Sequence, residues 1–196
     1  LGEYDYLVHF AAESHVDNSI TNGKPFIRTN VEGTFNLLEC ARQNKSLKKF
    51  IHISTDEVYG DMDDPKYNSI LGIKKKADEK DSLEGSSYYS ATKASSDLLV
   101  LAAHRTFGLP YIITRTCNNY GSHQHKEKFL PTIIRSIKEG KEIPVYGDGL
   151  NVREWINVKD NVQQLYKLML SDLTNEIFNI GTGETYTNLD IVGMIG

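Results

Sequence analysis

The sequence predicts an α/β fold, in which helices cover both faces of a parallel sheet. Short apolar runs that suit buried strands alternate along the chain with longer segments whose apolar residues recur at helical spacing. Parallel strands cannot be joined by tight hairpins, so the intervening helices supply the crossover connections. With 196 residues and 39% hydrophobic content, the chain can bury one core, or one core with a small lobe attached.

Strands and helices alternate clearly through the first part of the chain. The apolar run Tyr6–Ala12 fits a buried strand, and Asn30–Asn44 follows it as a helix. Phe50–Ser54 repeats the strand signal, and Tyr89–Phe107 is a long helix whose leucines supply an apolar face. Pro110–Thr116 is the next strand.

The later elements are shorter. Phe129–Glu139 is predicted to be a helix that Gly140 ends. Asp160–Leu170 is predicted to be another helix, with Asp160 as its N-cap, and Glu176–Ile180 is predicted to be the last strand. A further helix begins shortly before the chain stops.

Polar residues gather directly after the predicted strands, at Glu13–His15, Thr55–Glu57 and Asn118–Gly121. Ligands of open parallel sheets bind at the carboxyl ends of the strands, so these positions are expected to form the site. The long polar loop Gly60–Ser87 has a length that usually indicates function or disorder.

Composition excludes several classes of protein. The net charge is −4, and the densest basic run, Lys74–Lys76, is interpreted as a solvated loop, so no nucleic-acid surface is predicted. Cys40 and Cys117 are too few for a disulfide framework and do not have the spacing of zinc ligands. Without a signal peptide or an apolar run of membrane-spanning length, no membrane partner is expected and the cytoplasm is the default location.

Tyr89 and Lys93 stand four residues apart at the start of a predicted helix, which places both side chains on one face. An adjacent ammonium favours the phenolate form of tyrosine, which can then act as a base toward an alcohol near neutral pH. Small neighbours, Ser90, Ala91 and Ala94, leave room for a flat cofactor. Alone, such a pair occurs by chance in many helices.

An ordered set of motifs makes that interpretation much more specific. The motifs are His9–Asp17, Thr29–Thr34, Ser54–Gly60, Tyr89–Lys93, Asn118–Gly121 and Val152–Trp155. Over nearly its whole length the chain resembles the extended short-chain dehydrogenase/reductase superfamily and, within it, the nucleotide-sugar 4,6-dehydratases, closest to the dTDP-glucose 4,6-dehydratases. The resemblance implies a Rossmann-like doubly wound parallel sheet with a small α/β substrate lobe.

Asp56 and Glu57 are the pair that distinguishes a dehydratase from its relatives. Removing water across C5–C6 of a sugar needs a base for the C5 proton and an acid for the departing 6-hydroxyl, and two carboxyl groups can divide these roles. By resemblance Glu57 takes the proton and Asp56, with a raised pKa, protonates the leaving group. Without the family likeness, a capping Asp beside a solvated Glu is the simpler interpretation.

The resemblance implies a hydro-lyase of deoxysugar biosynthesis with NAD as a reagent that is not consumed. Tyr89, assisted by Lys93, removes the 4-hydroxyl proton of dTDP-glucose while hydride leaves C4 for NAD⁺. Elimination of water follows, and the hydride returns to C6 to give dTDP-4-keto-6-deoxyglucose. Thr55 is expected to bond the 4-oxygen of the sugar.

Other residues are carried over from the family one by one. The predicted cofactor-binding residues are Phe10, Ala11, Ala12, Thr29, Tyr89, Lys93 and Asn119. The predicted substrate-binding residues are Ser14, Thr55, Asn118, Lys128, Phe129, Pro144, Tyr146, Arg153 and Asn179. Arg153 suits a pyrophosphate because a guanidinium can form two parallel hydrogen bonds, although a surface ion pair with Glu154 or Asp148 is the alternative.

The family pattern divides the chain into a partial NAD-binding domain at residues 1–120, which holds the catalytic residues, and a substrate-binding lobe at 121–196. Residues at about 150–180 are expected to return to the first domain. The Gly-x-x-Gly-x-x-Gly phosphate loop of the family does not occur, so the sequence is expected to be a fragment that binds NAD poorly and is inactive alone.

Several alternatives stay open. One is a 4,6-dehydratase for a UDP- or CDP-sugar, and another is a nucleotide-sugar epimerase or decarboxylase, against which Asp56 and Glu57 argue. A third is a scaffold protein that only binds a sugar nucleotide. The resemblance also implies a homodimer formed through the helices that contain Val31–Ala41 and Tyr89–Phe107.

Overall fold

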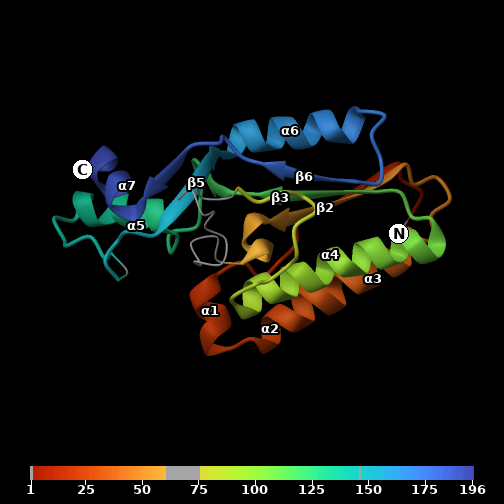
Figure 1. The fold of residues 1–196 in the computed structure, drawn as a ribbon, viewed down its shortest axis with the longest axis horizontal. Helices are drawn as coiled ribbons and strands as arrows, with labels where there is room; N and C mark the ends of the chain where they lie inside the picture. Colours follow the sequence, from red (N-terminus) through yellow and green to blue (C-terminus); the bar gives the residue numbers. More distant parts are fainter. Residues whose placement is uncertain (1, 61–75, 146) are drawn as a thin grey trace, which may run out of the picture. The chain divides into compact units, whose positions relative to one another are not determined.

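The computed structural model describes residues 2–60, 76–145 and 147–196, and its order of elements is drawn in Figure 1. The elements are β1 (Tyr6–His9), α1 (Val16–Thr21), α2 (Lys24–Phe26), the π-helix η1 (Ile27–Glu32), α3 (Gly33–Ala41), β2 (Lys49–Thr55), the 3₁₀ helix η2 (Asp56–Tyr59), α4 (Tyr88–Phe107), β3 (Tyr111–Thr116), β4 (Asn118–Tyr120), α5 (Phe129–Lys138), β5 (Val152–Asn157), α6 (Val158–Leu170), β6 (Glu176–Ile180), β7 (Thr185–Thr187) and α7 (Asn188–Ile195). The predicted α/β class is confirmed.

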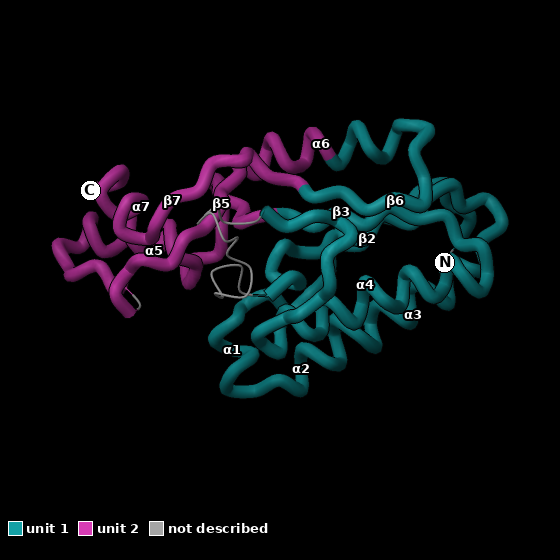
Figure 2. Tube along the Cα trace, in the orientation of Figure 1, with its two compact units in different colours: residues 1–116, 165–179 teal, residues 117–164, 180–196 magenta. Residues whose placement is uncertain are grey.

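The chain divides into two compact units, coloured separately in Figure 2. Unit 1 comprises residues 1–116 and 165–179, and unit 2 comprises residues 117–164 and 180–196. Each unit is described by itself below.

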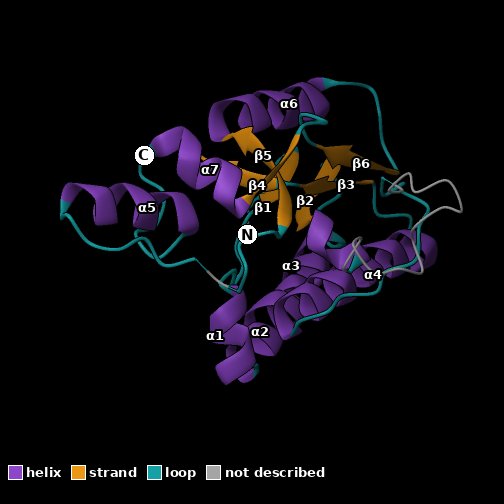
Figure 3. Ribbon diagram, turned by 60° about the vertical axis from the view of Figure 1, so that its left-hand side comes forward, coloured by secondary structure: helices purple, strands orange, loops and turns teal. Residues whose placement is uncertain are grey.

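Unit 1 is built on a sheet with the strand order β1-β2-β3-β6. β1 and β2 pair in parallel, as do β2 and β3, so the carboxyl ends of these strands lie at one edge. Helices α3 and α4 cover one face of the sheet, and the last turns of α6 lie on the other (Figures 1 and 3). This is the parallel, two-sided architecture that the alternation of strands and helices predicts.

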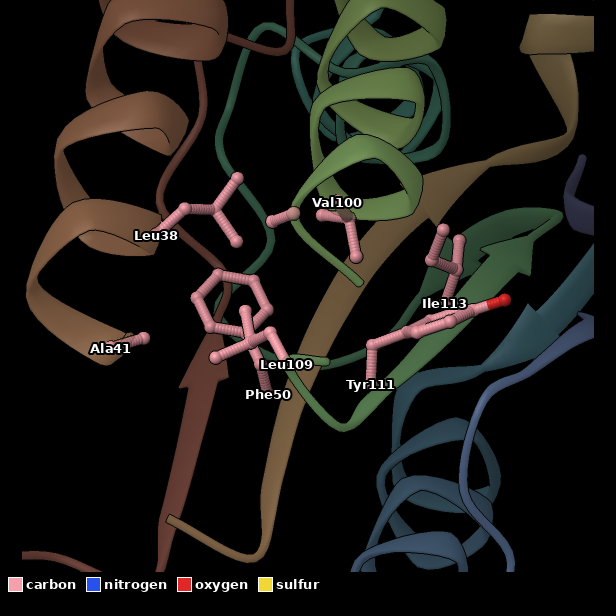
Figure 4. Packing of buried hydrophobic residues seen from close by; sticks show 8 residues of the cluster. Leu38, Ala41, Phe50, Val100, Leu109, Tyr111 and Ile113 are labelled. Carbon is pink, nitrogen blue, oxygen red and sulfur yellow. The ribbon is translucent and has the colours of Figure 1, made fainter. Parts of the chain in front are cut away.

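The core of unit 1 lies between the sheet and the helix pair α3–α4. Figure 4 shows Leu38 from α3 and Val100 from α4 directed toward Phe50 of β2. Phe50 and Val100 are fully buried, and Leu38 is nearly so. Burying such side chains stabilises the fold by about 1.5–3 kcal/mol each. This packing holds α4, which carries Tyr89 and Lys93, against the sheet.

Helix α4 has well-formed signals at both ends. Ser87 and Ser90 form a capping box, in which each hydroxyl accepts a hydrogen bond from the backbone N–H of the other residue. Gly108 ends the helix with a left-handed φ of 71°, and its N–H donates to the His104 carbonyl. The first turn of α4 is therefore fixed at its N-terminus, where Tyr89 lies.

Unit 2 contains a smaller sheet with the strand order β4-β5-β7. β4 and β5 are parallel, whereas β5 and β7 are antiparallel. Trp155 of β5 stacks on Phe129 at the start of α5, with ring centroids 6.2 Å apart. Thr187 and Asp190 form a capping box for α7, the helix that the sequence predicts near its end.

Several predicted boundaries are wrong, most of them by one or two residues, and the largest differences lie in the first part of the chain. β1 ends at His9 rather than Ala12, because its ladder with β2 ends where His9 pairs with His52. The helix predicted at Asn30–Asn44 starts earlier, through α2 and η1, since Pro25 suits a first helical turn. It ends at Ala41, and Asn44 belongs to a turn whose amide donates to the Tyr4 carbonyl.

Asp160 is not the N-cap of α6, which starts at Val158. The Asn157 side chain accepts a hydrogen bond from the Lys159 N–H at 3.0 Å, so the last residue of β5 takes this role. The last strand, predicted at Glu176–Ile180, is confirmed with these bounds.

Part of the predicted loop Gly60–Ser87 lies outside the described residues. Among the helices that the structure describes, none has both the length and the apolar content that crossing a membrane requires.

Lys49, the first residue of β2, fastens the end of α6 in unit 1. Its side chain is 4% exposed, and Nζ donates to the Leu168 carbonyl at 2.9 Å, to the Met169 carbonyl at 3.1 Å and to the Ser171 carbonyl. These acceptors are C-terminal carbonyls of a helix, which otherwise have no intrahelical donor. The cation also complements the negative end of the helix dipole.

We therefore expect Lys49→Met in the full-length protein to lower the free energy of unfolding by about 2 kcal/mol, the typical scale for lost charged hydrogen bonds. Urea denaturation measures this change. Lys48→Met is the matched control. Lys48 makes an exposed ion pair with Asp5 and lies over the Tyr6 ring, 6.0 Å from its centroid, so its loss should cost less than about 0.5 kcal/mol. Equal losses in the two variants would contradict the role of Lys49.

Candidate active site

The carboxyl end of β2 presents two neighbouring acidic residues. Thr55, the last residue of β2, is 7% exposed and caps the 3₁₀ helix η2. Its Oγ1 accepts from the Glu57 N–H at 3.3 Å and donates to Asp56 Oδ1 at 3.2 Å. Thr55 thus fixes the turn that places Asp56 and Glu57 at the edge of the sheet.

Tyr89 and Lys93 lie on the first two turns of α4, as predicted from their spacing. Lys93 is 4% exposed, and its Nζ donates to the carbonyl of Ile53 on β2 at 2.7 Å. Tyr89 meets the ring of Phe26 edge-on, with centroids 6.5 Å apart. The helix therefore brings the phenol and the ammonium to the same strand end that carries the acidic pair.

The electrostatics of Tyr89 differ from the prediction. Burial raises the pKa of the phenol above its ordinary value, the negative charges of Glu57 and Asp56 raise it further, and a hydrogen bond with Thr55 opposes them. The sequence predicted that Lys93 lowers the pKa of Tyr89. In the structure it does not, because the ammonium is directed at the Ile53 carbonyl. The same effects show that Thr55, Asp56 and Glu57 lie close to Tyr89.

Lys93 itself is held near the balance between its two protonation states. Burial lowers the pKa of its ammonium from 10.5 to about 8, and the nearby Asp97 carboxylate limits the fall. A lysine with such a pKa changes charge within the working range of most enzymes. Perturbed groups of this kind cluster at functional sites.

Asn30 in the π-helix η1 forms a group of buried hydrogen bonds that the sequence did not predict. Its side chain, 1% exposed, accepts from the Glu13 N–H at 2.8 Å and donates to the Glu13 carbonyl and to Thr92 Oγ1, each at 3.0 Å. Thr92 in turn donates to the Tyr89 carbonyl at 2.8 Å. Asn30 therefore connects the segment after β1 to the first turn of α4, which carries Tyr89.

Of the predicted cofactor and sugar residues in unit 1, most lie on the segments that Asn30 joins. Phe10, Ala11, Ala12 and Ser14 follow β1, with Phe10 58% exposed, and Thr29 lies on η1. Asn179 is placed differently: its Oδ1 accepts from the Tyr59 hydroxyl at 2.7 Å and its Nδ2 donates to the Ala77 carbonyl at 3.0 Å.

The other predicted binding residues belong to unit 2. Asn118 begins β4, and the Asn119 side chain donates to the Cys117 carbonyl and accepts from Asn161 Nδ2 at 2.8 Å. Arg153 Nη1 donates to the Val152 carbonyl at 2.9 Å. The rest are Lys128, the N-cap of α5, Phe129, stacked on Trp155, and the exposed Pro144. Tyr146 lies outside the described residues.

Two histidines are buried beneath the site in unit 1, and both are held neutral. His9 Nε2 is 2.9 Å from Thr34 Oγ1, and its ring centroid lies 5.3 Å from that of His52. Burial, reinforced by the charges of His52 and Lys93, lowers the pKa of His9 from 6.5 to about 3. Burial also lowers the pKa of His52.

These histidines predict a loss of stability in mild acid. Between the unfolded pKa near 6.5 and the folded value near 3, the unfolded state binds more protons, so stability falls as the pH decreases. From about pH 7 to about pH 5 we expect His9 to contribute a loss of about 1–2 kcal/mol. Urea denaturation of the full-length protein at several pH values measures it.

His9→Gln should reduce this pH dependence, while His123→Gln, at an exposed position, should leave it unchanged. An unaltered slope in the His9 variant would show that His9 does not carry the effect.

Within the described ranges, no group of three or more His, Cys, Asp or Glu side chains is placed to hold a metal ion. The site therefore consists of a phenol and an ammonium one helical turn apart, beside two carboxyl groups, at the carboxyl edge of a parallel sheet. This arrangement defines the class of short-chain dehydrogenases/reductases.

The chain belongs to the NAD dependent epimerase/dehydratase family, whose family model matches residues 2–181. It is 46% identical over 190 residues to the low-salt glycan biosynthesis protein Agl12 of Haloferax volcanii, covering 97% of this chain and 58% of that protein. It is 43% identical to the dTDP-glucose 4,6-dehydratase of Haemophilus influenzae, covering 97% and 56%. The chain thus spans about half the length of the curated relatives it matches.

Solved structures agree in fold. The dTDP-glucose 4,6-dehydratase DesIV of Streptomyces venezuelae, as a double mutant with NAD and DAU bound, matches with a TM-score of 0.89 and 42% identity, covering 97% of this chain and 56% of that one. The UDP-glucuronic acid 4-epimerase of Bacillus cereus, in complex with UDP-glucuronic acid and NAD, matches with a TM-score of 0.88 and 29% identity, covering 97% and 58%.

Proposed function

We propose that the full-length protein containing this chain is a dTDP-glucose 4,6-dehydratase, which converts dTDP-glucose to dTDP-4-keto-6-deoxyglucose. The observation that carries the proposal is the position of Asp56 and Glu57, close enough to Tyr89 to raise the pKa of its phenol. An alcohol-oxidising pair alone would suit an epimerase equally well. Two carboxyl groups beside it supply the base and the acid that elimination of water needs.

The residues present fit the nicotinamide end of NAD. A buried ammonium and a phenol lie one turn apart, and the small residues Ala11 and Ala12 follow β1 on the segment that Asn30 fastens to α4. Lys93, Tyr89 and Thr29 are the groups proposed to hold this end, and Asn119 of unit 2 is proposed to contribute. When bound, NAD⁺ would supply a hydride acceptor and a positive charge.

Tyr89 is proposed to take the proton from the sugar 4-hydroxyl. The raised pKa disfavours the phenolate that acts as the base. A nearby cation favours the phenolate, so the Lys93 ammonium has to remain charged. Thr55, which is within hydrogen-bonding range of Tyr89, is proposed to hold the same 4-oxygen. These groups prepare the 4-ketone, which acidifies the C5 proton.

Glu57 is proposed to remove the C5 proton and Asp56 to protonate the departing 6-hydroxyl. Both begin η2 and are positioned by Thr55, so they reach the substrate from one strand end. C6 then receives the hydride that left C4, and C5 receives a proton. The product is a 4-keto-6-deoxy sugar. Because the base and the acid are adjacent residues, both groups can reach neighbouring carbons of one bound sugar.

Unit 2 is proposed to be the substrate-binding lobe and unit 1 the partial NAD-binding domain. The candidates for the nucleotide diphosphate pocket are Lys128, Tyr146, Arg153 and Asn179. The other proposed substrate-binding residues are Ser14, Thr55, Asn118, Phe129 and Pro144. Because Asn179 already bonds Tyr59 and Ala77 within unit 1, its proposed contact with substrate requires that this amide exchange partners.

A product assay tests the function. The full-length protein with NAD is incubated with dTDP-glucose, UDP-glucose or CDP-glucose, and the products are followed by NMR. We expect a 4-keto-6-deoxy sugar from dTDP-glucose with no net NADH. Preferential turnover of UDP- or CDP-glucose would reassign the substrate, a C4 epimer would indicate an epimerase, and lasting NADH would indicate a simple dehydrogenase. Sugar-nucleotide binding without turnover would indicate a scaffold protein.

We also propose that a second copy of the chain covers the exposed apolar residues of α3 and α4. Phe35 of α3 is 50% exposed and Leu98 of α4 is 57% exposed, and both helices pack together in unit 1. Large exposed apolar side chains on adjacent helices are typical of an interface. The full-length protein should sediment as a dimer, and Phe35→Asp with Leu98→Asp should yield monomers. A wild-type monomer at working concentration would contradict the proposal.

A further inference from the structure

Asp97 is a buried carboxylate one helical turn beyond Lys93 on α4. It is 0% exposed, and its Oδ2 accepts from Arg115 Nε on β3 at 3.0 Å. Its Oδ1 lies 3.4 Å from His52 Nε2 on β2. Residues four apart on a helix lie on the same face, so the carboxylate is also the nearest acidic neighbour of Lys93 along α4.

Arg115 extends this cluster to η2 and to residue 79, which lies in the later part of the loop Gly60–Ser87. Its Nη1 donates to the Tyr59 hydroxyl at 2.8 Å and to the Glu79 carbonyl at 3.1 Å. Its guanidinium also lies over the Tyr59 ring, 4.9 Å from the centroid. Asp97 on α4 therefore contacts both central strands, through His52 on β2 and Arg115 on β3. Through Arg115 it is also linked to η2 and to residue 79.

We propose that Asp97 is a positioning residue for the Tyr89–Lys93 pair, and that its carboxylate, which Arg115 also binds, supplies the charge that keeps the Lys93 ammonium in place for oxidation of the sugar. The inference rests on the proposed function, since it assigns a residue to that reaction. Asp97 touches neither the substrate nor the cofactor in this role. It acts through Lys93.

The charges around Asp97 explain why its carboxylate matters. The groups that face it are Arg115 and Lys93 as cations, with His52 neutral and Tyr89 as a phenol. Burial raises the pKa of Asp97, but the hydrogen bonds and charges of His52, Ser54 and Arg115 hold it below its ordinary value. Without this carboxylate, the buried Lys93 ammonium would lose the one charge that opposes the effect of burial on its pKa. Its other titratable neighbours, His9 and His52, are neutral.

The stability of the protein is a poor test of this role. A buried ion pair often contributes little net stability, because desolvation offsets the attraction, while removing one partner is strongly destabilising whatever the function. The discriminating readout is the pH at which Lys93 titrates, since a merely structural contact has no reason to move it in a chosen direction.

The test measures the pH profile of single-turnover C4 oxidation in the full-length protein, followed by transient NADH absorbance. The wild-type rate should fall above about pH 8, where Lys93 loses its proton. Asp97→Asn should move this alkaline limb down by at least about one pH unit, which lowers the rate about fivefold at pH 8 and about tenfold at higher pH. Arg115→Gln removes the competing cation, so the limb should move to higher pH.

The two variants have opposite expected signs, so either one that folds decides the question. Val100→Ala is the matched control, because it opens a cavity one turn further along α4 without changing a charge. Its limb should stay at the wild-type pH. An unshifted limb in Asp97→Asn or Arg115→Gln, or a shift of the same sign in both, would overturn the role of Asp97.

A titration of Lys93 by ¹³C NMR of the lysine Cε separates this inference from the proposed function. The resonance is assigned by its loss in Lys93→Met, and its midpoint should fall in Asp97→Asn. If the wild type does not dehydrate the sugar nucleotide but the midpoint shifts, the function fails and the electrostatic link stands. If the wild type turns over and the midpoint does not move, the role of Asp97 fails and the function stands.

Discussion

Tyr89→Phe is expected to lower the rate of C4 oxidation in the full-length protein by about 10²–10⁴-fold, the usual loss when a general base is removed. The phenol is the group at the strand end that can accept the proton of the sugar 4-hydroxyl, with Thr55 beside it. Phenylalanine keeps the ring and its edge contact with Phe26 but has no oxygen. Transient NADH in a single turnover is the measurement.

Tyr88→Phe is the matched control for this change. Tyr88 precedes Tyr89 at the start of α4 and is 60% exposed, so removing its hydroxyl should leave the transient unchanged. A Tyr89 variant that forms NADH at the wild-type rate would mean that another group takes the proton. A loss of equal size in both variants would instead point to damage at the start of α4.

Asp56→Asn combined with Glu57→Gln is expected to leave C4 oxidation in place and to lower elimination of water by about 10³-fold or more. Both replacements keep the size of the side chain and the cap that Thr55 makes to the Glu57 N–H. The oxidised sugar and NADH should therefore accumulate. Exchange of the C5 proton with deuterated solvent measures the loss of the base directly.

A variant with Asp172→Asn and Glu176→Gln controls for the loss of two negative charges, because both residues are exposed in unit 1. Its exchange and elimination should match the wild type. Turnover that is unchanged in the Asp56 and Glu57 variant would return the pair to a capping residue beside a solvated one. The C4 oxidation would then favour an epimerase.

The sequence predicted the larger elements of unit 1 because their signals are local. The long helix α4 and the buried strand β3 are recognisable from periodicity and from apolar content, and β6 has the predicted bounds. The π-helix η1 and the short strands of unit 2 carry no such pattern. β7 has three residues, and its identity depends on antiparallel pairing with β5, more than thirty residues away.

The candidate site divides in the same way. Tyr89 with Lys93, and Asp56 with Glu57, are each close in sequence, so spacing and residue type were enough to find them. Asn30 and Arg115 act through contacts 62 and 18 residues away, to Thr92 and Asp97, which only the fold supplies.

The direction of the Tyr89 pKa shows a further limit of spacing. An ammonium four residues away predicts a lower value, but the Lys93 side chain turns to the Ile53 carbonyl and burial dominates. The sequence could have indicated that Asp97 forms an ion pair, because a carboxylate one turn beyond Lys93 on a buried helix face needs a partner. Its partner on β3 could not be chosen without the register of the sheet.

The fate of the C4 hydrogen tests the central claim most directly. The full-length protein with NAD is given dTDP-glucose that carries deuterium at C4, and the product is examined by NMR and mass spectrometry. Oxidation, elimination and hydride return at one site predict a 4-keto-6-deoxy product with the deuterium on C6 and a solvent-derived hydrogen at C5. Deuterium found at C4 of an epimer, or retained in released NADH, would contradict the account.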